Sequence, residues 1–177
     1  PVVCLVGKAH EFHVRTALGV PLEENLANIA ASVAHVVGLG REAILDAEHF
    51  FDGWKANPGY ALDCLRAGLD AGARWVVLCD TNGGTLPAEV GAITGAVIAA
   101  GVPGNRLGIH AHDDTGNAVA NAFVQVGLVV AILAFGLMQT VVGYHLMVDT
   151  RFQHPNVDMI AALRAGDLDI AVMWGPI

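Results

Sequence analysis

A chain of 177 residues, of which 54% are hydrophobic, can bury the core of one domain or of part of one. The formal net charge of -8 argues against nucleic acid as a partner, because phosphate groups are neutralised by basic patches. Cys4, Cys64 and Cys79 are scattered without a C-x-x-C pair, which is typical of reduced thiols. The first residues show no signal-peptide pattern, and we therefore expect a cytoplasmic protein.

The first two thirds of the chain alternate between short apolar segments and longer segments with apolar residues at helical spacing. The predicted strands cover residues 1–6, 42–47, 74–79 and 107–109, and the predicted helices cover residues 22–37, 58–71, 87–100 and the segment after Gly116. The valine-rich first strand is expected to be buried on both faces. Strands that alternate with helices in this way are parallel and joined by right-handed crossovers.

Polar residues follow the carboxyl end of each predicted strand, in residues 7–13, 48–53, 80–85 and 110–116. The loops after the helices contain mainly glycine and proline. This asymmetry is typical of a (β/α) barrel, whose active site is built from the loops at one face. An open doubly wound sheet also binds ligands at its strand ends, but neither a G-x-G-x-x-G nor a Walker A motif is present. The sequence therefore predicts an α/β fold, a partial TIM (β/α) barrel.

His110 and His112 lie two residues apart at the end of the last predicted strand. Residues i and i+2 of a strand point to the same face, so both imidazoles would project side by side. Such a pair can bind a divalent cation, with further oxygen ligands from elsewhere; alternatively, the two histidines simply close a strand. One of Asp113, Asp114 and Thr115 can cap the helix that follows.

Four further residues at the strand ends are candidates for the same site. Glu48 could accept or orient a proton, or it could be a solvated loop acid. Asp80 and Thr81 could hold a substrate carboxylate, although Asp-Thr-Asn-Gly is also ordinary turn chemistry. His13 is the weakest candidate, since a single loop histidine is commonly just exposed. A thiol nucleophile at Cys79 is not favoured, because no histidine lies near it in sequence.

Five motifs, in order, carry a resemblance to a known family: GKAHEFHV, ALGVPLEENL, DAEHFFDGWKANPGYAL, LCDTNGGTLPAEV and GIHAHDDTGNAVAN. Residues 2–122 resemble the citramalate synthases, which belong with isopropylmalate and homocitrate synthases and hydroxymethylglutaryl-CoA lyase to a metal-dependent acyltransferase and lyase family. The resemblance implies a TIM barrel and a divalent metal (Mn2+, Mg2+, Co2+ or Zn2+) held partly by His110 and His112. It also implies condensation of acetyl-CoA with a 2-oxoacid, pyruvate being favoured, in branched-chain amino-acid biosynthesis.

The resemblance assigns roles to the other candidates. The metal would polarise the keto acid, the acetyl-CoA methyl would be deprotonated, and thioester hydrolysis would follow attack of the enolate. Thr81, with Asp80 beside it, would hold the carboxylate of the 2-oxoacid. Glu48 and His13 would be the catalytic residues that line the keto-acid pocket. An intact family member is expected to be a homodimer that acts on small molecules.

The sequence departs from the family pattern at three places. The Asp-Arg-Glu-type strand, which supplies a metal aspartate and a keto-acid arginine, is not in this chain. Asp113 stands where the family usually has asparagine, and the Asn-Gly-rich loop that completes the metal site is not found. We therefore expect residual metal binding at most, and no useful turnover, from the 177 residues themselves.

The last third differs in kind. We expect a partial barrel over residues 1–123, an apolar junction over 124–137 and a foreign α/β tail over 138–177. The segment 148–177 resembles part of a periplasmic solute-binding protein associated with quinoprotein alcohol dehydrogenases, so the alternative is a non-catalytic solute-binding fragment or a chimeric gene product. Residues 126–148 contain no charged side chain and are long enough to span a membrane, but Gly127, Gly136 and Gly143 interrupt them at strand-like intervals. We therefore expect strands over 128–134 and 144–148 and no membrane partner.

Overall fold

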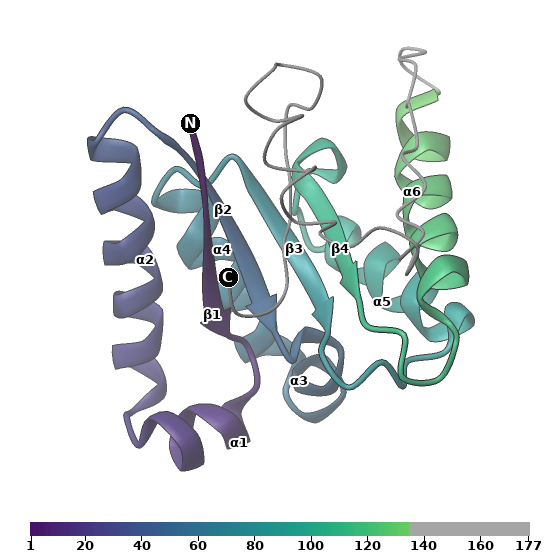
Figure 1. Cartoon of the computed structure of the whole chain (residues 1–177), viewed down its shortest axis with the longest axis horizontal. Coiled ribbons are helices and arrows are strands. Elements are labelled where there is room, and N and C mark those ends of the chain that lie inside the picture. The colour runs from purple at the N-terminus through teal and green to yellow at the C-terminus, as the bar shows by residue number, and fades with distance from the viewer. Residues whose placement is uncertain (135–177) are drawn as a thin grey trace, which may run out of the picture. The chain divides into compact units, whose positions relative to one another are not determined.

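The computed structural model describes residues 1–134, which form a four-stranded parallel sheet with helices packed on it (Figure 1). The strands are β1 (Val2–Lys8), β2 (Glu42–Glu48), β3 (Trp75–Asp80) and β4 (Leu107–Ala111). The helices are α1 (Glu11–His13), α2 (Leu22–Gly38), α3 (Phe50–Ala56), α4 (Pro58–Asp70), α5 (Pro87–Ala99) and α6 (Ala118–Ala134), with two short helical turns at Val14–Leu18 and Gly104–Arg106.

The order of the strands identifies the fold as part of a barrel. The strands lie side by side in chain order, β1-β2-β3-β4. Successive right-handed crossovers in one direction place all the connecting helices on the same face, and Figure 1 shows α4 and α5 behind the sheet. A doubly wound sheet would reverse its strand order and have helices on both faces. The predicted partial (β/α) barrel is therefore confirmed.

The core lies between the outer face of the sheet and the helices. Helix α2 packs on β1 and β2, α4 packs on β2 and β3, and α6 packs on β4 and α5. The core side chains from the strands are those of alternate residues, Ala43, Leu45, Ala47, Val76, Leu78 and Leu107. The intervening residues of the same strands project from the opposite, inner face of the sheet, where the candidate site lies.

The prediction that the first strand is buried on both faces is wrong. Val2 and Val6 are 39% and 66% exposed, whereas Val3 and Leu5 pack against the core. Among the described residues β1 pairs with β2 alone and has α2 on its outer face, so alternate side chains remain on the open inner face. The valine content of this segment indicates a strand, but whether a face of the strand is buried depends on whether another layer of structure packs on that face.

Three segments predicted to be non-helical contain helical residues in the structure. The loops predicted over residues 7–13 and 48–53 contain the end of β1 with α1, and the start of α3. The strand predicted over 128–134 is wrong, because these residues complete α6; the exposed Gly127 does not interrupt the helix. None of the helices in residues 1–134 has the length and apolar character that a bilayer crossing requires.

The remaining predictions about the last third, including the 138–177 tail, the strand at 144–148 and the solute-binding alternative, lie outside the described residues. The predicted junction at 124–137 begins inside α6. The domain boundaries stay a prediction.

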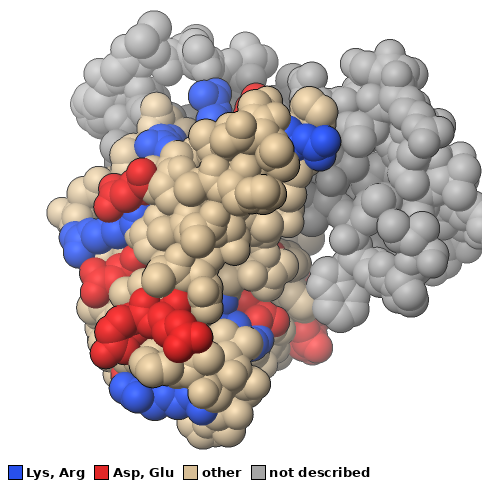
Figure 2. Space-filling model, turned by 90° about the vertical axis from the view of Figure 1, so that its left-hand side faces the viewer, with Lys and Arg blue, Asp and Glu red and all other residues tan. Residues whose placement is uncertain are grey.

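The charged side chains on the α2 side of the molecule lie in small separate groups of both signs among residues of neither kind (Figure 2). The described residues of this face show no continuous basic surface.

Candidate functional site

The four strands point their carboxyl ends to the edge of the sheet where α1 and α3 lie (Figure 1). Glu48 ends β2, Thr81 follows β3, and His110 and His112 come from the end of β4. The predicted residues are therefore at one rim. The imidazole rings of His110 and His112 stack with their centroids 4.7 Å apart and an interplanar angle of 29°, so the prediction that they project side by side is confirmed. Asp113 Oδ1 accepts from the backbone N–H of Ala118, the first residue of α6 (3.0 Å), and so satisfies one of the amides that a helix start leaves without an intrahelical partner, although Asp113 itself lies five residues before the helix.

His110 is held by two buried side chains, one from the neighbouring strand β3 and one from β2 on the far side of β3. Its Nδ1 lies 2.7 Å from Asp46 Oδ2 of β2 and 3.4 Å from Cys79 Sγ, its register partner in β3. The hydrogen bond to Asp46, followed by that to Cys79, raises the pKa of His110 to about 10. Neither Asp46 nor Cys79 was predicted as a site residue, because their proximity to His110 depends on strand register.

The side chains at this rim fit a divalent metal. Cys79, His110 and His112 each offer a ligand atom, and these atoms lie within 4.8 Å of one another. Asp46 is 8% exposed, and its Oδ1 is buried without a hydrogen-bond partner among the described residues. Two imidazoles are nitrogen donors that first-row divalent metals use, and the Asp46 carboxylate beside His110 adds negative charge that favours a cation. The predicted metal ligands therefore lie in suitable chemical surroundings.

Thr81 is held by contacts on both sides of its hydroxyl group. Thr81 Oγ1 donates to Cys79 Sγ (3.2 Å) and accepts from the backbone N–H of His49 (2.7 Å). His49 has φ 59° and ψ 33°, and it is the only non-glycine residue with positive φ in residues 1–134. Such a conformation costs on the order of 1–3 kcal/mol and tends to occur at functional sites. His49 stacks on His13 with ring centroids 3.9 Å apart, which brings the predicted His13 to the same rim.

Glu48 forms an ion pair with Lys8, its register partner at the end of β1. Both side chains are about one quarter exposed, at 27% and 22%. Asn25 of α2 donates to the Lys8 carbonyl oxygen (2.9 Å) and to the Tyr60 hydroxyl (2.7 Å), which anchors the end of β1. Sequence reasoning missed Lys8, although its place directly after an apolar strand was an available signal.

Asp80 has a structural set of contacts. It is 1% exposed, Oδ1 accepts from the Thr85 hydroxyl (2.7 Å), and Oδ2 accepts from the Thr85 backbone N–H (3.1 Å). Asn121 of α6 donates to the Thr85 carbonyl oxygen (2.9 Å). Both Asp80 oxygens thus hold Thr85 in the loop after β3, and Asn121 joins the same residue to α6. The predicted substrate-binding role of Asp80 stays a prediction.

A pocket of about 460 Å³ opens at the rim. Its lining residues are His10, His13, Asp52, Lys55, Ala56 and Asn82. Burial, followed by the neighbouring His13, lowers the pKa of His10 and of His49, so both favour the neutral imidazole at neutral pH. Of the predicted site residues, only His13 lines this pocket.

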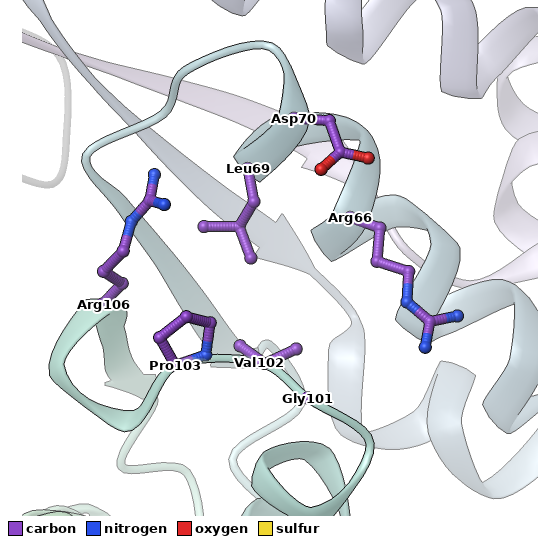
Figure 3. Close-up of a pocket in the computed structure, with 7 residues that line it drawn as sticks. All are labelled: Arg66, Leu69, Asp70, Gly101, Val102, Pro103 and Arg106. Atoms are coloured by element: carbon purple, nitrogen blue, oxygen red, sulfur yellow. The ribbon is translucent and has the colours of Figure 1, made fainter.

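A second pocket, of about 380 Å³, lies at the opposite end of the sheet, between α4 and the loop that precedes β4 (Figure 3). Figure 3 shows the guanidinium groups of Arg66 and Arg106 on opposite sides of Leu69. Arg66 donates to the carbonyl of Ala100 at the end of α5, and Arg106 donates to that of Arg74. These arginines satisfy backbone carbonyls at the end of a helix and beside a strand start, which is a structural role.

Comparisons with known proteins agree with this geometry. The HMGL-like family model matches residues 2–128. The (R)-citramalate synthase of Streptomyces coelicolor is 53% identical over 125 residues, covering 71% of this chain and 23% of that protein. The (R)-citramalate synthase of Aquifex aeolicus is 52% identical over 126 residues, covering 71% and 24% respectively. The crystal structure of Bacillus subtilis HMG-CoA lyase superposes with a TM-score of 0.61 at 22% identity, covering 72% of this chain and 43% of the lyase.

The chain spans about a quarter of the length of the curated relatives it matches. The region matched by the family model begins at the start of β1 and ends within α6, so it contains every rim residue described above. The chain therefore belongs to the HMGL-like family.

Proposed function

We propose that the protein represented by this chain is a citramalate synthase like the relatives named above, and that it condenses acetyl-CoA with a 2-oxoacid, pyruvate in the first place. The observation that carries this proposal is the convergence of Glu48, Thr81 and the histidine pair from three adjacent strands at one rim. These residues lie inside the region that is about half identical to those enzymes.

His110 and His112 would hold a divalent metal in this function. When bound, the metal supplies Lewis acidity to the keto carbonyl of the substrate. Two imidazoles leave coordination positions for oxygen ligands, and the substrate and further protein groups are the natural sources. Nitrogen and oxygen donors accept several first-row cations, so the proposal covers a divalent metal and does not name one.

Thr81 is suited to bind the carboxylate of the 2-oxoacid. The His49 N–H fixes the position of its oxygen, and its hydroxyl hydrogen is given to Cys79 Sγ, a weak acceptor. A substrate carboxylate is a stronger acceptor than sulfur, so the hydroxyl can exchange the thiol for the substrate at little cost.

Glu48 is the proposed general base for the acetyl methyl group, with the proton moving from the methyl carbon to a Glu48 carboxylate oxygen. The Lys8 ammonium balances the charge of this carboxylate and restricts its orientation. The stacked His13 and His49 rings form the adjoining wall, where His13 is proposed to contact the keto acid.

The test is a chimera in which residues 2–128 of this chain replace the matching region of the Streptomyces coelicolor (R)-citramalate synthase. We expect pyruvate-dependent release of free thiol from acetyl-CoA, and loss of it in the chimera that carries His112→Ala. A well-folded chimera that binds metal but releases no thiol with any 2-oxoacid would contradict the proposal. The 177-residue chain alone is expected to show no useful turnover, and dimerisation and a cytoplasmic location stay predictions.

A further inference from the structure

We infer that Asp46 is a positioning residue that fixes the orientation of His110, so that metal is taken on Nε2 and Cys79 stays outside the coordination sphere. This inference rests on the metal site of the proposed function. It adds a residue that no sequence motif indicated, and it decides between two ways of using the same imidazole.

The first step of the argument is the hydrogen bond itself. A carboxylate only accepts hydrogen bonds, so the 2.7 Å contact between Asp46 Oδ2 and His110 Nδ1 requires a hydrogen on Nδ1. With Nδ1 occupied, Nε2 is the nitrogen that can offer a lone pair to a metal. A carboxylate that fixes the ring of a metal-binding histidine in this way also increases the basicity of the ligating nitrogen.

The second step concerns the competing arrangement. Cys79 Sγ and His110 Nδ1 are 3.4 Å apart, which is a separation that two ligands of one metal can have. A metal bound between them would displace the hydrogen that Nδ1 gives to Asp46. Asp46 is 8% exposed and its Oδ1 already has no hydrogen-bond partner among the described residues. That arrangement would therefore leave a buried carboxylate with neither oxygen hydrogen-bonded, which is strongly unfavourable.

The third step is the environment of the thiol. Cys79 is 2% exposed and accepts a hydrogen bond from the Thr81 hydroxyl. In the inferred arrangement Cys79 packs behind His110 and supports Thr81, and the metal meets nitrogen and oxygen donors only. Such a site accepts hard cations such as Mn2+ or Mg2+ more readily than a site with a thiolate ligand, which would shift the preference further towards Zn2+.

The experiment is a set of Mn2+ titrations by calorimetry on the 177-residue chain, with unfolding curves recorded for every variant. We expect Asp46→Ala to weaken Mn2+ binding roughly 10- to 100-fold, as loss of such carboxylates does elsewhere. Asp46→Asn keeps the shape of the side chain and an oxygen acceptor, and it should weaken binding less. Asp52→Asn is the matched control, since it removes the same charge from the rim pocket, where Asp52 contacts Asn82 rather than His110. Parent-like affinity in Asp46→Ala would overturn the inference.

Two spectroscopic measurements read the arrangement directly. In the Zn2+-loaded parent, long-range 1H–15N correlation spectra should show His110 with its hydrogen on Nδ1 and the metal on Nε2. The Co2+-loaded parent should lack the intense thiolate-to-cobalt absorption of a cysteine ligand. A Co2+ thiolate band that disappears in Cys79→Ala would overturn the inference even if Asp46→Ala failed to fold.

A parallel titration separates this inference from the proposed function. The variant His110→Ala with His112→Ala should lose Mn2+ binding. If it binds as the parent does, the metal site of the proposed function is wrong. If it loses binding while Asp46→Ala retains it, the metal site stands and only the role of Asp46 is overturned.

Discussion

Substitution of Gly53 tests whether close packing of α3 against the turn after β1 holds the rim together, because Gly53 lies at this contact. A Cβ at Gly53 would lie 2.2 Å from the Ala9 carbonyl oxygen, 2.9 Å from the Ala9 carbonyl carbon and 3.0 Å from His10 Cα. All three atoms belong to the backbone, and Ala9 is fully buried. No rotamer change can relieve the contact, so Gly53→Ala must displace α3 from the end of β1. The same displacement would move the His49 N–H away from Thr81.

The magnitude follows from two opposing terms. Alanine is favoured over glycine inside a helix by about 1 kcal/mol. Overpacking of a close-packed contact costs about 1–3 kcal/mol, and occasionally more. Because the obstacle is a backbone carbonyl, we take the upper part of that range and expect a net loss of about 2 kcal/mol in the free energy of unfolding.

Urea unfolding followed by tryptophan fluorescence measures this loss, and Trp54 lies in α3 itself. With m near 2 kcal/mol/M, the midpoint should fall by about 1 M urea. The control is Gly127→Ala in α6, where an added Cβ meets nothing within 4 Å and a gain of up to about 1 kcal/mol is expected. If both alanine variants were equally stabilised, the close approach of α3 to Ala9 would be refuted.

Three further predictions concern burial. Asp80→Asn should lower the free energy of unfolding by about 1.5–3 kcal/mol, because it weakens the charge-assisted hydrogen bonds from Thr85 to the Asp80 carboxylate. A urea midpoint equal to that of the parent would contradict the structural role of Asp80. Burial raises the pKa of the Cys64 thiol to about 12, so Ellman's reagent at pH 8 should label the exposed Cys4 in the folded chain and Cys64 only after unfolding. Comparable labelling rates for Cys4 and Cys64 in the folded chain would argue against the described core. Val6→Ala should change stability by less than about 0.5 kcal/mol, since Val6 is 66% exposed, and a loss as large as a core truncation would show that another layer covers this face.

Local pattern was sufficient for most of the element order. The four strands and the helices α2, α4 and α5 lie within two residues of their predicted bounds, because strand and helix periodicity are properties of neighbouring residues. The segment 128–134 failed for the same reason: a continuous apolar run fits a buried strand and a buried helix equally well, and packing of α6 against α5 and β4 decides for the helix.

The sequence by itself determined which residues stand at the strand ends and therefore which rim they share, since parallel strands with like connections must place their carboxyl ends together. Only the tertiary structure decided how these residues interact. The Asp46–His110 bond joins residues 64 positions apart, and the Cys79–His110 contact joins residues 31 positions apart. Such contacts depend on the register of three strands, β2, β3 and β4. The same register leaves the buried Asp46 Oδ1 without a hydrogen-bond partner among the described residues. No periodicity within a single element encodes either.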